Sequence, residues 1–232
     1  MPPSSDPTFL SRLRHADPDR FFCTLFAPTC KRELLAILYL FNNELARARE
    51  VASEPMLALI RLQWWREVVE GQRKKHDIAT PLSDALEAGV FHASELEALI
   101  TAREAEAGEI ADFPAFLAYA RGTGGRLARI AGRLLGADSP EIEDLGTAYA
   151  ISGILRAAPY LARQNRSLLP ADGTEPAYLA EHAAKLLRAK PPRIALAAAL
   201  PAVLARRDLS RPHERNLGDR VAVLRAGLTG RV

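Results

Sequence analysis

Cysteine is scarce in this sequence, which contains only two such residues among 232. Cys23 and Cys30 lack the Cys-x-x-Cys spacing and the nearby histidines that are typical of zinc sites. If they share one helix, their seven-residue separation places them roughly 10 Å apart along its axis, too far for a disulfide. We therefore expect both to be buried free thiols.

The sequence also lacks the uninterrupted apolar run of about 18 residues that a transmembrane helix requires. Its first residues, Met-Pro-Pro-Ser-Ser-Asp-Pro, do not have the basic-then-apolar order of a secretory signal. These absences predict a protein that is kept in a reducing cytoplasm.

β-branched residues are sparse, whereas alanine and leucine dominate a chain that is 48% hydrophobic. Glycine and proline fall between long segments whose apolar residues recur at helical spacing. This pattern indicates an all-α protein. Because a chain of this length can bury one large core, we expect a single domain.

The net charge of +3 at pH 7 is too small to indicate nucleic acid, and we expect no such partner. The charge is unevenly distributed, because seven arginines stand against three acidic residues between positions 201 and 232. Such a segment could contact anionic lipid, with about 1 kcal/mol for each basic residue near the surface. The alternative is a solvated helix face with internal ion pairs.

Helix breakers and caps divide the chain into predicted helices. Asp17 and Pro18 are typical of a helix start, and Pro28 should end that helix. Further helices are expected at residues 31–51, 56–72, from 80 onward, 93–107, 113–135, 142–162, 176–188 and 192–207.

Two of these predicted helices contain residues that disturb helical geometry. Gly122, Gly124 and Gly125 could permit close helix packing or mark a kink, and their spacing is not that of a phosphate-binding loop. Pro159 should bend or end its helix, because it removes a backbone donor.

The predicted helix at residues 56–72 contains two adjacent tryptophans. Its core stripe is expected to consist of Leu57, Ile60, Trp64 and Val68. One of the two indoles must then point away from the stripe, so it could line a cavity or a partner surface. The histidines are scattered, with no helical pairing that would indicate a metal site or a catalytic base.

Several short motifs follow one another in a specific order along the chain. They are Asp19-Arg20-Phe21-Phe22, Leu38-Tyr39-Leu40-Phe41, Trp65-Arg66, Leu99-Ile100, Phe116-Leu117-Ala118-Tyr119-Ala120 and Ile154-Leu155-Arg156, followed by residues 166–170. In this order they resemble the squalene/phytoene synthase family. The resemblance implies an isoprenoid-synthase-type helical bundle at residues 17–207, between an N-terminal extension (1–16) and a basic C-terminal tail (208–232).

Enzymes of this family condense two prenyl diphosphates, and Mg²⁺ must bridge the leaving group. Two aspartate-rich motifs on facing helices normally supply the hard oxygen ligands that Mg²⁺ prefers. In the first motif, two aspartate positions are Ala46 and Arg47, and only Glu50 keeps a carboxylate. In the second, the aspartate positions fall on Ala157 and Leu161. We therefore expect no bound metal and no cofactor, with Mg²⁺ required only if transferase activity remains.

Arg47 places a fixed positive charge where the cation would sit, which is costly in a low dielectric. It could pair with Glu44 and Glu50 in a helix salt-bridge ladder. Alternatively, Arg47, Arg156 and Arg166 could form a residual anion site. No residue is assigned a catalytic role, and the residues that we expect to line a degenerate ligand pocket are Tyr39, Asn43, Arg47, Glu50, Trp65, Arg66, Arg156, Tyr160 and Arg166.

Residues 40–46, 61–66 and 155–160 are similar to a branch of the family that is associated with assembly of respiratory complex I. This resemblance implies a non-catalytic accessory protein, cytoplasmic or peripheral at the inner membrane. Its implied partners are complex I subunits and an isoprenoid or lipid ligand. Two alternatives stay open: a Mg²⁺-dependent head-to-head prenyl transferase with substitute ligands, and an isoprenoid or lipid carrier without an assembly role.

Overall fold

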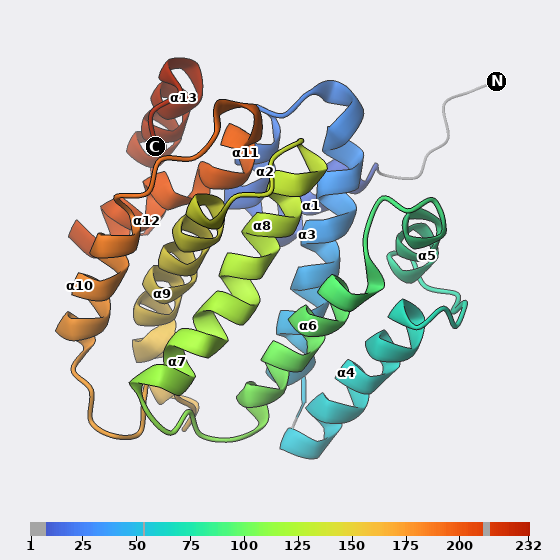
Figure 1. Ribbon diagram of the computed structural model, residues 1–232. Coiled ribbons are helices and arrows are strands. Elements are labelled where there is room, and N and C mark those ends of the chain that lie inside the picture. The colour runs from blue at the N-terminus through green and yellow to red at the C-terminus, as the bar shows by residue number, and fades with distance from the viewer. Residues whose placement is uncertain (1–7, 53, 211–213) are drawn as a thin grey trace.

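A computed structural model describes residues 8–52, 54–210 and 214–232 as a bundle of helices (Figure 1). The described residues contain no β-strand, so the expected all-α class is confirmed. No helix in these ranges is both long and apolar enough to cross a membrane. The α-helices are α1 (Phe9–Ala16), α2 (Pro18–Thr24), α3 (Thr29–Glu50), α4 (Pro55–Val69), α5 (Ala79–Glu87), α6 (Ala93–Arg103), α7 (Phe113–Ala120), α8 (Arg126–Leu134), α9 (Pro140–Ala162), α10 (Pro176–Leu186), α11 (Leu196–Ala199), α12 (Pro201–Ser210) and α13 (Leu217–Thr229).

Helix starts follow the capping residues in the sequence. The Asp17 side chain accepts a hydrogen bond from the backbone N–H of Arg20 at 2.9 Å, and Pro18 occupies the first turn of α2. At α7, Asp112 accepts from the backbone N–H of Ala115 at 2.8 Å. These side chains satisfy backbone donors that have no partner within the helix.

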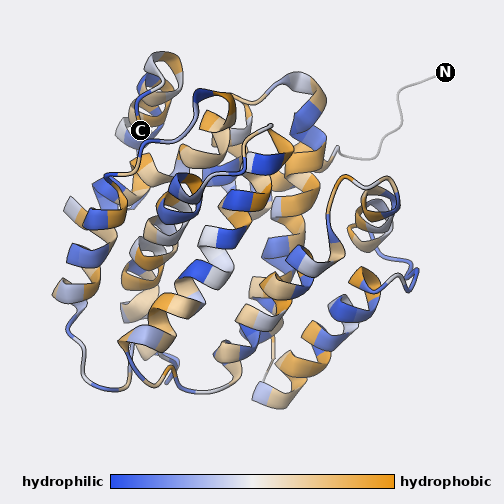
Figure 2. Cartoon of the chain, viewed as in Figure 1, coloured by the Kyte–Doolittle hydropathy of each residue, from blue (hydrophilic) through white to orange (hydrophobic). Residues whose placement is uncertain are grey.

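Helix α3 supplies much of the larger core and packs against α1, α4, α5 and α8. Its apolar face, expected at Leu34, Ile37, Leu38, Phe41 and Leu45, packs into the core: the last four are buried, and Leu34 is half-buried. Figure 2 shows apolar residues along most of this helix. Because neighbours cover it on several sides, α3 is a rigid support for side chains near its C-terminal end.

The expectation for the two cysteines is half wrong. Cys23 is buried in α2, and burial raises the pKa of its thiol well above the ordinary value. Cys30 is exposed. The reason is that α3 starts at Thr29, directly after Pro28, so Cys30 falls in an uncovered first turn.

The predicted core stripe of α4 is wrong in its first half. Leu57 and Ile60 are exposed, whereas Val68 is buried and Trp64 is half-buried. The buried face instead includes Ala58, Leu62 and Trp65. Both faces of this helix are apolar, so helical spacing alone could not select the one that packs. The exposed face leaves apolar side chains at the surface near the end of α3.

The glycines at residues 121–125 permit the close helix packing that was one of the two expectations for them. Arg121–Gly125 forms a π-helical turn between α7 and α8. A Cβ atom on Gly124 would lie 2.6 Å from the Cβ of Ala150 and 2.7 Å from the carbonyl oxygen of Gly146, so only glycine permits this contact with α9. The close approach fixes α9 against the middle of the bundle.

Two prolines act differently from each other. Helix α9 continues through Pro159 to Ala162, so Pro159 does not end it. The missing N–H costs little there because it affects only the last turn. Pro201, by contrast, separates α11 from α12 within the helix that we expected at residues 192–207.

Both terminal segments pack on the bundle within the described residues. Leu13 of α1 is fully buried, and α1 contacts α3. Val223 and Ala226 of α13 are buried in a cluster that also includes Cys23 of α2. The division of the chain at residues 17 and 207 stays a prediction.

Candidate functional site

The first motif lies at the C-terminal end of α3, which is where the enzyme family would bind its metal. Ala46 is half-buried, and Glu50 is exposed. The Arg47 side chain is 53% exposed and pairs with Glu44 at 3.4 Å between Nη1 and Oε1. One half of the expected salt-bridge ladder is therefore present. As a solvent-exposed pair, it contributes about 0–1 kcal/mol to stability.

The second motif lies in the last turns of α9. Leu161 is buried, Ala157 is half-buried, and neither carries an oxygen in its side chain. The neighbouring Arg156 directs Nη1 to within 3.9 Å of the Asp208 carboxylate on α12. Its charge is therefore partly neutralised by α12.

These two sets of residues do not fit Mg²⁺. The ion requires several hard oxygen ligands in near-octahedral geometry, and Glu50 is the single carboxylate left at the five motif positions compared above. Arg47 adds a positive charge to the same helix end. Among the residues described by the structure, no cluster of three or more His, Cys, Asp or Glu side chains is arranged to hold a metal ion.

A buried polar cluster occupies the space beside the first motif. Arg103 of α6 donates to Glu106 at 2.6 Å and to the Asn42 side-chain oxygen at 3.2 Å, and Tyr119 donates to Glu106 at 2.7 Å. Burial opposes the charge of Arg103, but Glu106 holds its pKa above the ordinary value. Burial likewise raises the pKa of the Tyr119 hydroxyl. The cluster therefore joins α3, α6 and α7 as a satisfied network.

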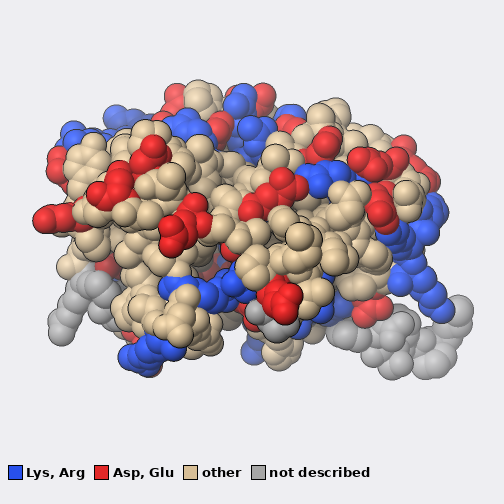
Figure 3. Space-filling view, turned by 90° about the horizontal axis from the view of Figure 1, so that it is seen from below, with Lys and Arg blue, Asp and Glu red and all other residues tan. Residues whose placement is uncertain are grey.

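A cavity of about 550 Å³ opens near the end of α9. We call it the loop cavity, because the connections α6–α7 and α9–α10 line most of it. Arg49 and Arg166 contribute positive charge to its wall, and Glu106 and Glu109 contribute negative charge. Leu161, Leu168 and Leu169 contribute apolar surface. These connections lie at the end of the bundle seen in Figure 3, where acidic and basic residues are intermingled.

A second cavity, of about 370 Å³, lies between α3 and α4. We call it the tryptophan cavity. Arg47, Trp64, Trp65 and His76 are among its lining residues. Arg47 and Arg166 thus line different cavities, while Arg156 pairs with Asp208. Of the expected pocket residues, this cavity brings together Arg47 and Trp65.

The adjacent indoles are divided as expected, but in the reverse order, because the predicted core stripe contained Trp64 and not Trp65. Trp65 is buried, with its ring centroid 5.4 Å from that of Phe41, whereas Trp64 is only half-buried. Arg66 donates to Glu104 at 2.7 Å and to Thr101 at 3.2 Å. This arginine therefore ties α4 to the end of α6.

The remaining expected residues are spread over the bundle. Tyr39 is buried in α3, and burial raises the pKa of its hydroxyl. Asn43 is half-buried one turn further along. Tyr160, after Pro159 on α9, is 61% exposed. Its ring is available to a partner molecule without any change in the core.

Comparison with known proteins connects this arrangement to a family. A model of the squalene/phytoene synthase family matches residues 13–182, which is most of the chain. The chain belongs to the squalene/phytoene synthase family. The assignment of Ala46, Arg47, Ala157 and Leu161 to changed metal-binding positions of this family stays a prediction from the sequence.

Individual relatives extend the comparison. The chain is 29% identical over 181 residues to the mouse (Mus musculus) protein "NADH dehydrogenase (ubiquinone) complex I, assembly factor 6", covering 73% of this chain and 54% of the mouse protein. The human (Homo sapiens) protein of the same name is 27% identical over 173 residues, covering 70% of this chain and 52% of the human protein. The chain therefore spans about half the length of the curated relatives that it matches.

A solved structure of a dehydrosqualene synthase in complex with ligand has the same fold. It superposes with a TM-score of 0.75 at 14% sequence identity, covering 96% of this chain and 94% of that one. The isoprenoid-synthase-type bundle expected from the sequence is confirmed.

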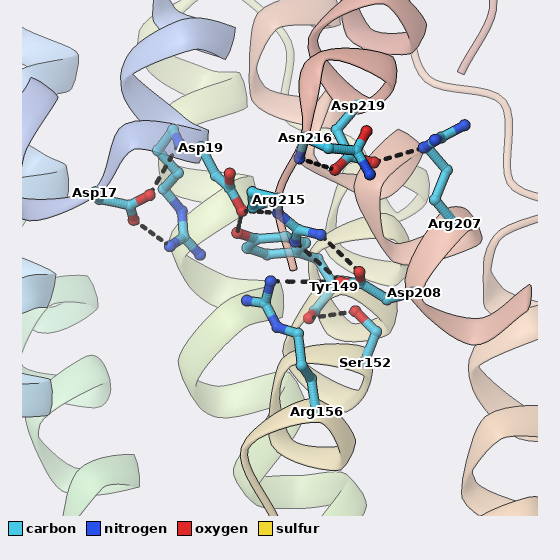
Figure 4. A network of polar contacts seen from close by, with 11 residues as sticks. Asp17, Asp19, Tyr149, Ser152, Arg156, Arg207, Asp208, Arg215, Asn216 and Asp219 are labelled. Atoms are coloured by element: carbon cyan, nitrogen blue, oxygen red, sulfur yellow. Dashed lines mark hydrogen bonds and ion pairs between the residues drawn. The ribbon is translucent and has the colours of Figure 1, made fainter. Parts of the chain in front are cut away.

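Sequence reasoning missed a second polar network of this family member, which lies among α2, α9, α12 and the start of α13 (Figure 4). Arg215 donates to both oxygens of Asp208, at 2.6 and 2.9 Å, and to Asp19 at 2.8 Å. The hydroxyl of Tyr149 donates to the same Asp19 oxygen at 3.1 Å. We call these residues, together with Asp17, Arg20 and Arg156, the charge clamp.

Ion pairs within the charge clamp neutralise several charged side chains near the two ends of the chain. Arg20 pairs with Asp17 at 2.7 Å and lies 5.0 Å from the ring centroid of Tyr149. Although burial opposes the charge of Arg215, its bonds to Asp208 and Asp19 raise its pKa. The alternation of Arg and Asp at residues 206–219 was the available signal for these ion pairs. It supports the internal-pairing interpretation for Arg207 and Arg215.

Proposed function

We propose that this chain is a non-catalytic squalene/phytoene synthase-like protein that acts as an assembly or accessory factor for respiratory complex I at the membrane face. One observation carries the proposal: four of the five motif positions are Ala46, Arg47, Ala157 and Leu161 in a chain that is similar over about 70% of its length to named complex I assembly factors. The supporting physical argument is that these side chains offer no ligand to Mg²⁺.

The loss of metal ligands removes the chemistry of the family but not its shape. Ionising an allylic diphosphate needs a cation to stabilise the departing charge. Arg47 carries positive charge but is exposed and paired with Glu44, so it cannot replace an enclosed pair of metal clusters. A bundle with these substitutions can still present surfaces and cavities to a partner.

The loop cavity supports a second candidate function, which is binding of an isoprenoid or lipid. Its wall combines leucine side chains with Arg49 and Arg166 and with Glu106 and Glu109, so the leucines suit an apolar chain and the arginines suit an anionic end. Organic extraction of the purified protein, followed by mass spectrometry, would identify such a ligand. This role is compatible with an accessory function, because ligand binding does not require turnover.

The partners that we propose are complex I subunits, with a peripheral contact to the inner membrane and no nucleic acid. Tyr160 is the side chain that we assign to the partner surface. It follows Pro159 at the end of α9 and is largely exposed. An exposed tyrosine supplies a large amphipathic ring at low entropic cost, which favours protein contacts.

The test compares membranes from cells that carry the wild-type gene, a deletion or Tyr160→Ala. Deletion should reduce NADH:ubiquinone oxidoreduction. Tyr160→Ala should reduce it as well, while the free energy of unfolding changes by less than about 0.5 kcal/mol because the ring is exposed. Tyr178→Ala is the matched control, since Tyr178 is also exposed, at 50%, but lies on α10. It should leave complex I activity unchanged.

Normal complex I activity in the deletion strain would contradict the assembly role. Normal activity in Tyr160→Ala cells alone would remove Tyr160 from the partner surface. Product formation from prenyl diphosphates that requires Mg²⁺ and disappears with EDTA would instead establish the transferase alternative.

A further inference from the structure

Helix α13 has two apolar faces, and only one of them packs. Val223 and Ala226 are buried against the bundle. On the other side, an apolar stripe is exposed. It consists of Leu217, Val221, Leu224 and Leu228, which are 75%, 55%, 44% and 77% exposed. Their spacing of four, three and four residues places them in one line along the helix.

The charges around the apolar stripe have one sign. Because each residue turns an α-helix by about 100°, Arg220 and Arg225 fall on opposite flanks of the stripe. Asp219 is the acidic residue of α13, and it is buried with its carboxylate paired to Arg207 at 2.6 Å. The exposed face of α13 is therefore apolar along its centre and positive along both edges.

We infer that α13 binds an anionic lipid bilayer, lying parallel to the surface. The stripe would enter the boundary between headgroups and acyl chains, and Arg220 and Arg225 would reach lipid phosphates. This arrangement of apolar and basic faces is what interfacial membrane helices use. Figure 1 shows α13 at one corner of the bundle, beside α12.

Charge distinguishes a bilayer from a second copy of the chain. A two-fold dimer through the apolar stripe would bring Arg220 and Arg225 close to their own symmetry copies, where like charges repel. An anionic bilayer instead attracts both flanks together. The inference rests on the membrane contact in the proposed function and deepens it, because the stripe adds an apolar contribution that arginines alone would lack.

The test is flotation of the purified full chain with mixed phosphatidylcholine–phosphatidylglycerol vesicles and with pure phosphatidylcholine vesicles, at low and high salt. Wild type should bind the mixed vesicles and keep part of this binding at high salt. Leu224→Ser/Leu228→Ser should lower the partition coefficient about tenfold or more at both salt concentrations. Arg220→Gln/Arg225→Gln should lower it about twentyfold at low salt only, since salt screens the arginines.

The matched control is Met56→Ser/Ile60→Ser, which removes two comparably exposed apolar side chains (63% and 59%) from α4. It should bind vesicles as wild type does. Thermal melts would confirm that every variant is folded. Absence of wild-type binding, an equal loss in the α4 control, or a wild-type dimer that the stripe substitutions separate would overturn the inference. Vesicle binding is measured without complex I, so its failure is distinguishable from failure of the assembly role.

Discussion

The two ends of α9 belong to one helix but have opposite characters. From Pro140 to Ile154 the helix is largely buried, and Gly146 lies against the π-helical turn. Its last turns, which contain the former metal positions Ala157 and Leu161, expose Pro159 and Tyr160. The first part sets the position of the helix, whereas the last part sets what the helix can bind. A family fold can therefore persist without its metal ligands, because packing and chemistry depend on different turns.

The largest expected effect on stability comes from disrupting the packed half of α9. In Gly146→Ala, the new methyl would lie 2.5 Å from the Gly124 carbonyl oxygen and closer still to the Cβ of Ala128. Neither neighbour is a flexible side-chain end, so α9 itself must shift. We expect the free energy of unfolding to fall by about 1–3 kcal/mol, as for overpacked cores. Urea unfolding followed by circular dichroism would measure it.

Gly153→Ala is the matched control for this prediction. It lies on the same helix, but an added Cβ would meet nothing within 4 Å. Because alanine loses less conformational entropy on folding than glycine, the substitution should stabilise the protein by roughly 0.5–1 kcal/mol. If both substitutions had the same effect, the close approach would not hold α9 in place.

Sequence reasoning predicted the fold better than the site, and α4 explains part of the difference. The breakers, caps and apolar spacing gave the order of the long helices. They could not choose between the two apolar faces of α4, so Leu57 and Ile60 were assigned to the core although they are exposed. The choice depends on which neighbour covers the helix, and that information is not local.

The long-range pair of the charge clamp could not be predicted from the sequence for a related reason. Asp19 and Arg215 are separated by 196 residues and meet only when α2 and the start of α13 are placed together. Counting arginines near the C-terminus therefore overestimated the charge available to lipid. The assignment of the changed metal positions needed only residue types at motif spacing, and it stays a prediction.

A smaller effect is expected from weakening the clamp that positions the packed half of α9. Tyr149→Phe removes the hydrogen bond from the Tyr149 hydroxyl to Asp19 but leaves the bond from Arg215 to Asp19 intact. We expect a loss of about 1 kcal/mol in the free energy of unfolding. Tyr178→Phe, at an exposed tyrosine of α10, should change it by less than about 0.5 kcal/mol. A Tyr149→Phe protein as stable as wild type would show that the clamp does not depend on this hydroxyl.

The smallest expected effect is on the stability of the protein at alkaline pH, and it also involves Tyr149. Burial, followed by the nearby Asp17 and Asp19, raises the pKa of Tyr149 in the folded protein. An unfolded tyrosine loses its proton near pH ~10, so above that pH the folded state binds more protons than the unfolded state. Stability should therefore fall as pH rises beyond about 10.

Tyr149→Phe removes the contribution of this tyrosine to the loss of stability at alkaline pH. Its free energy of unfolding should decline less steeply than that of wild type above pH ~10, although Tyr39 and Tyr119, whose pKa values burial also raises, keep part of the slope. Urea unfolding at a series of pH values would compare the two curves. Parallel curves would mean that Tyr149 ionises as readily in the folded chain as in the unfolded one, and that the packed half of α9 does not shield it from solvent.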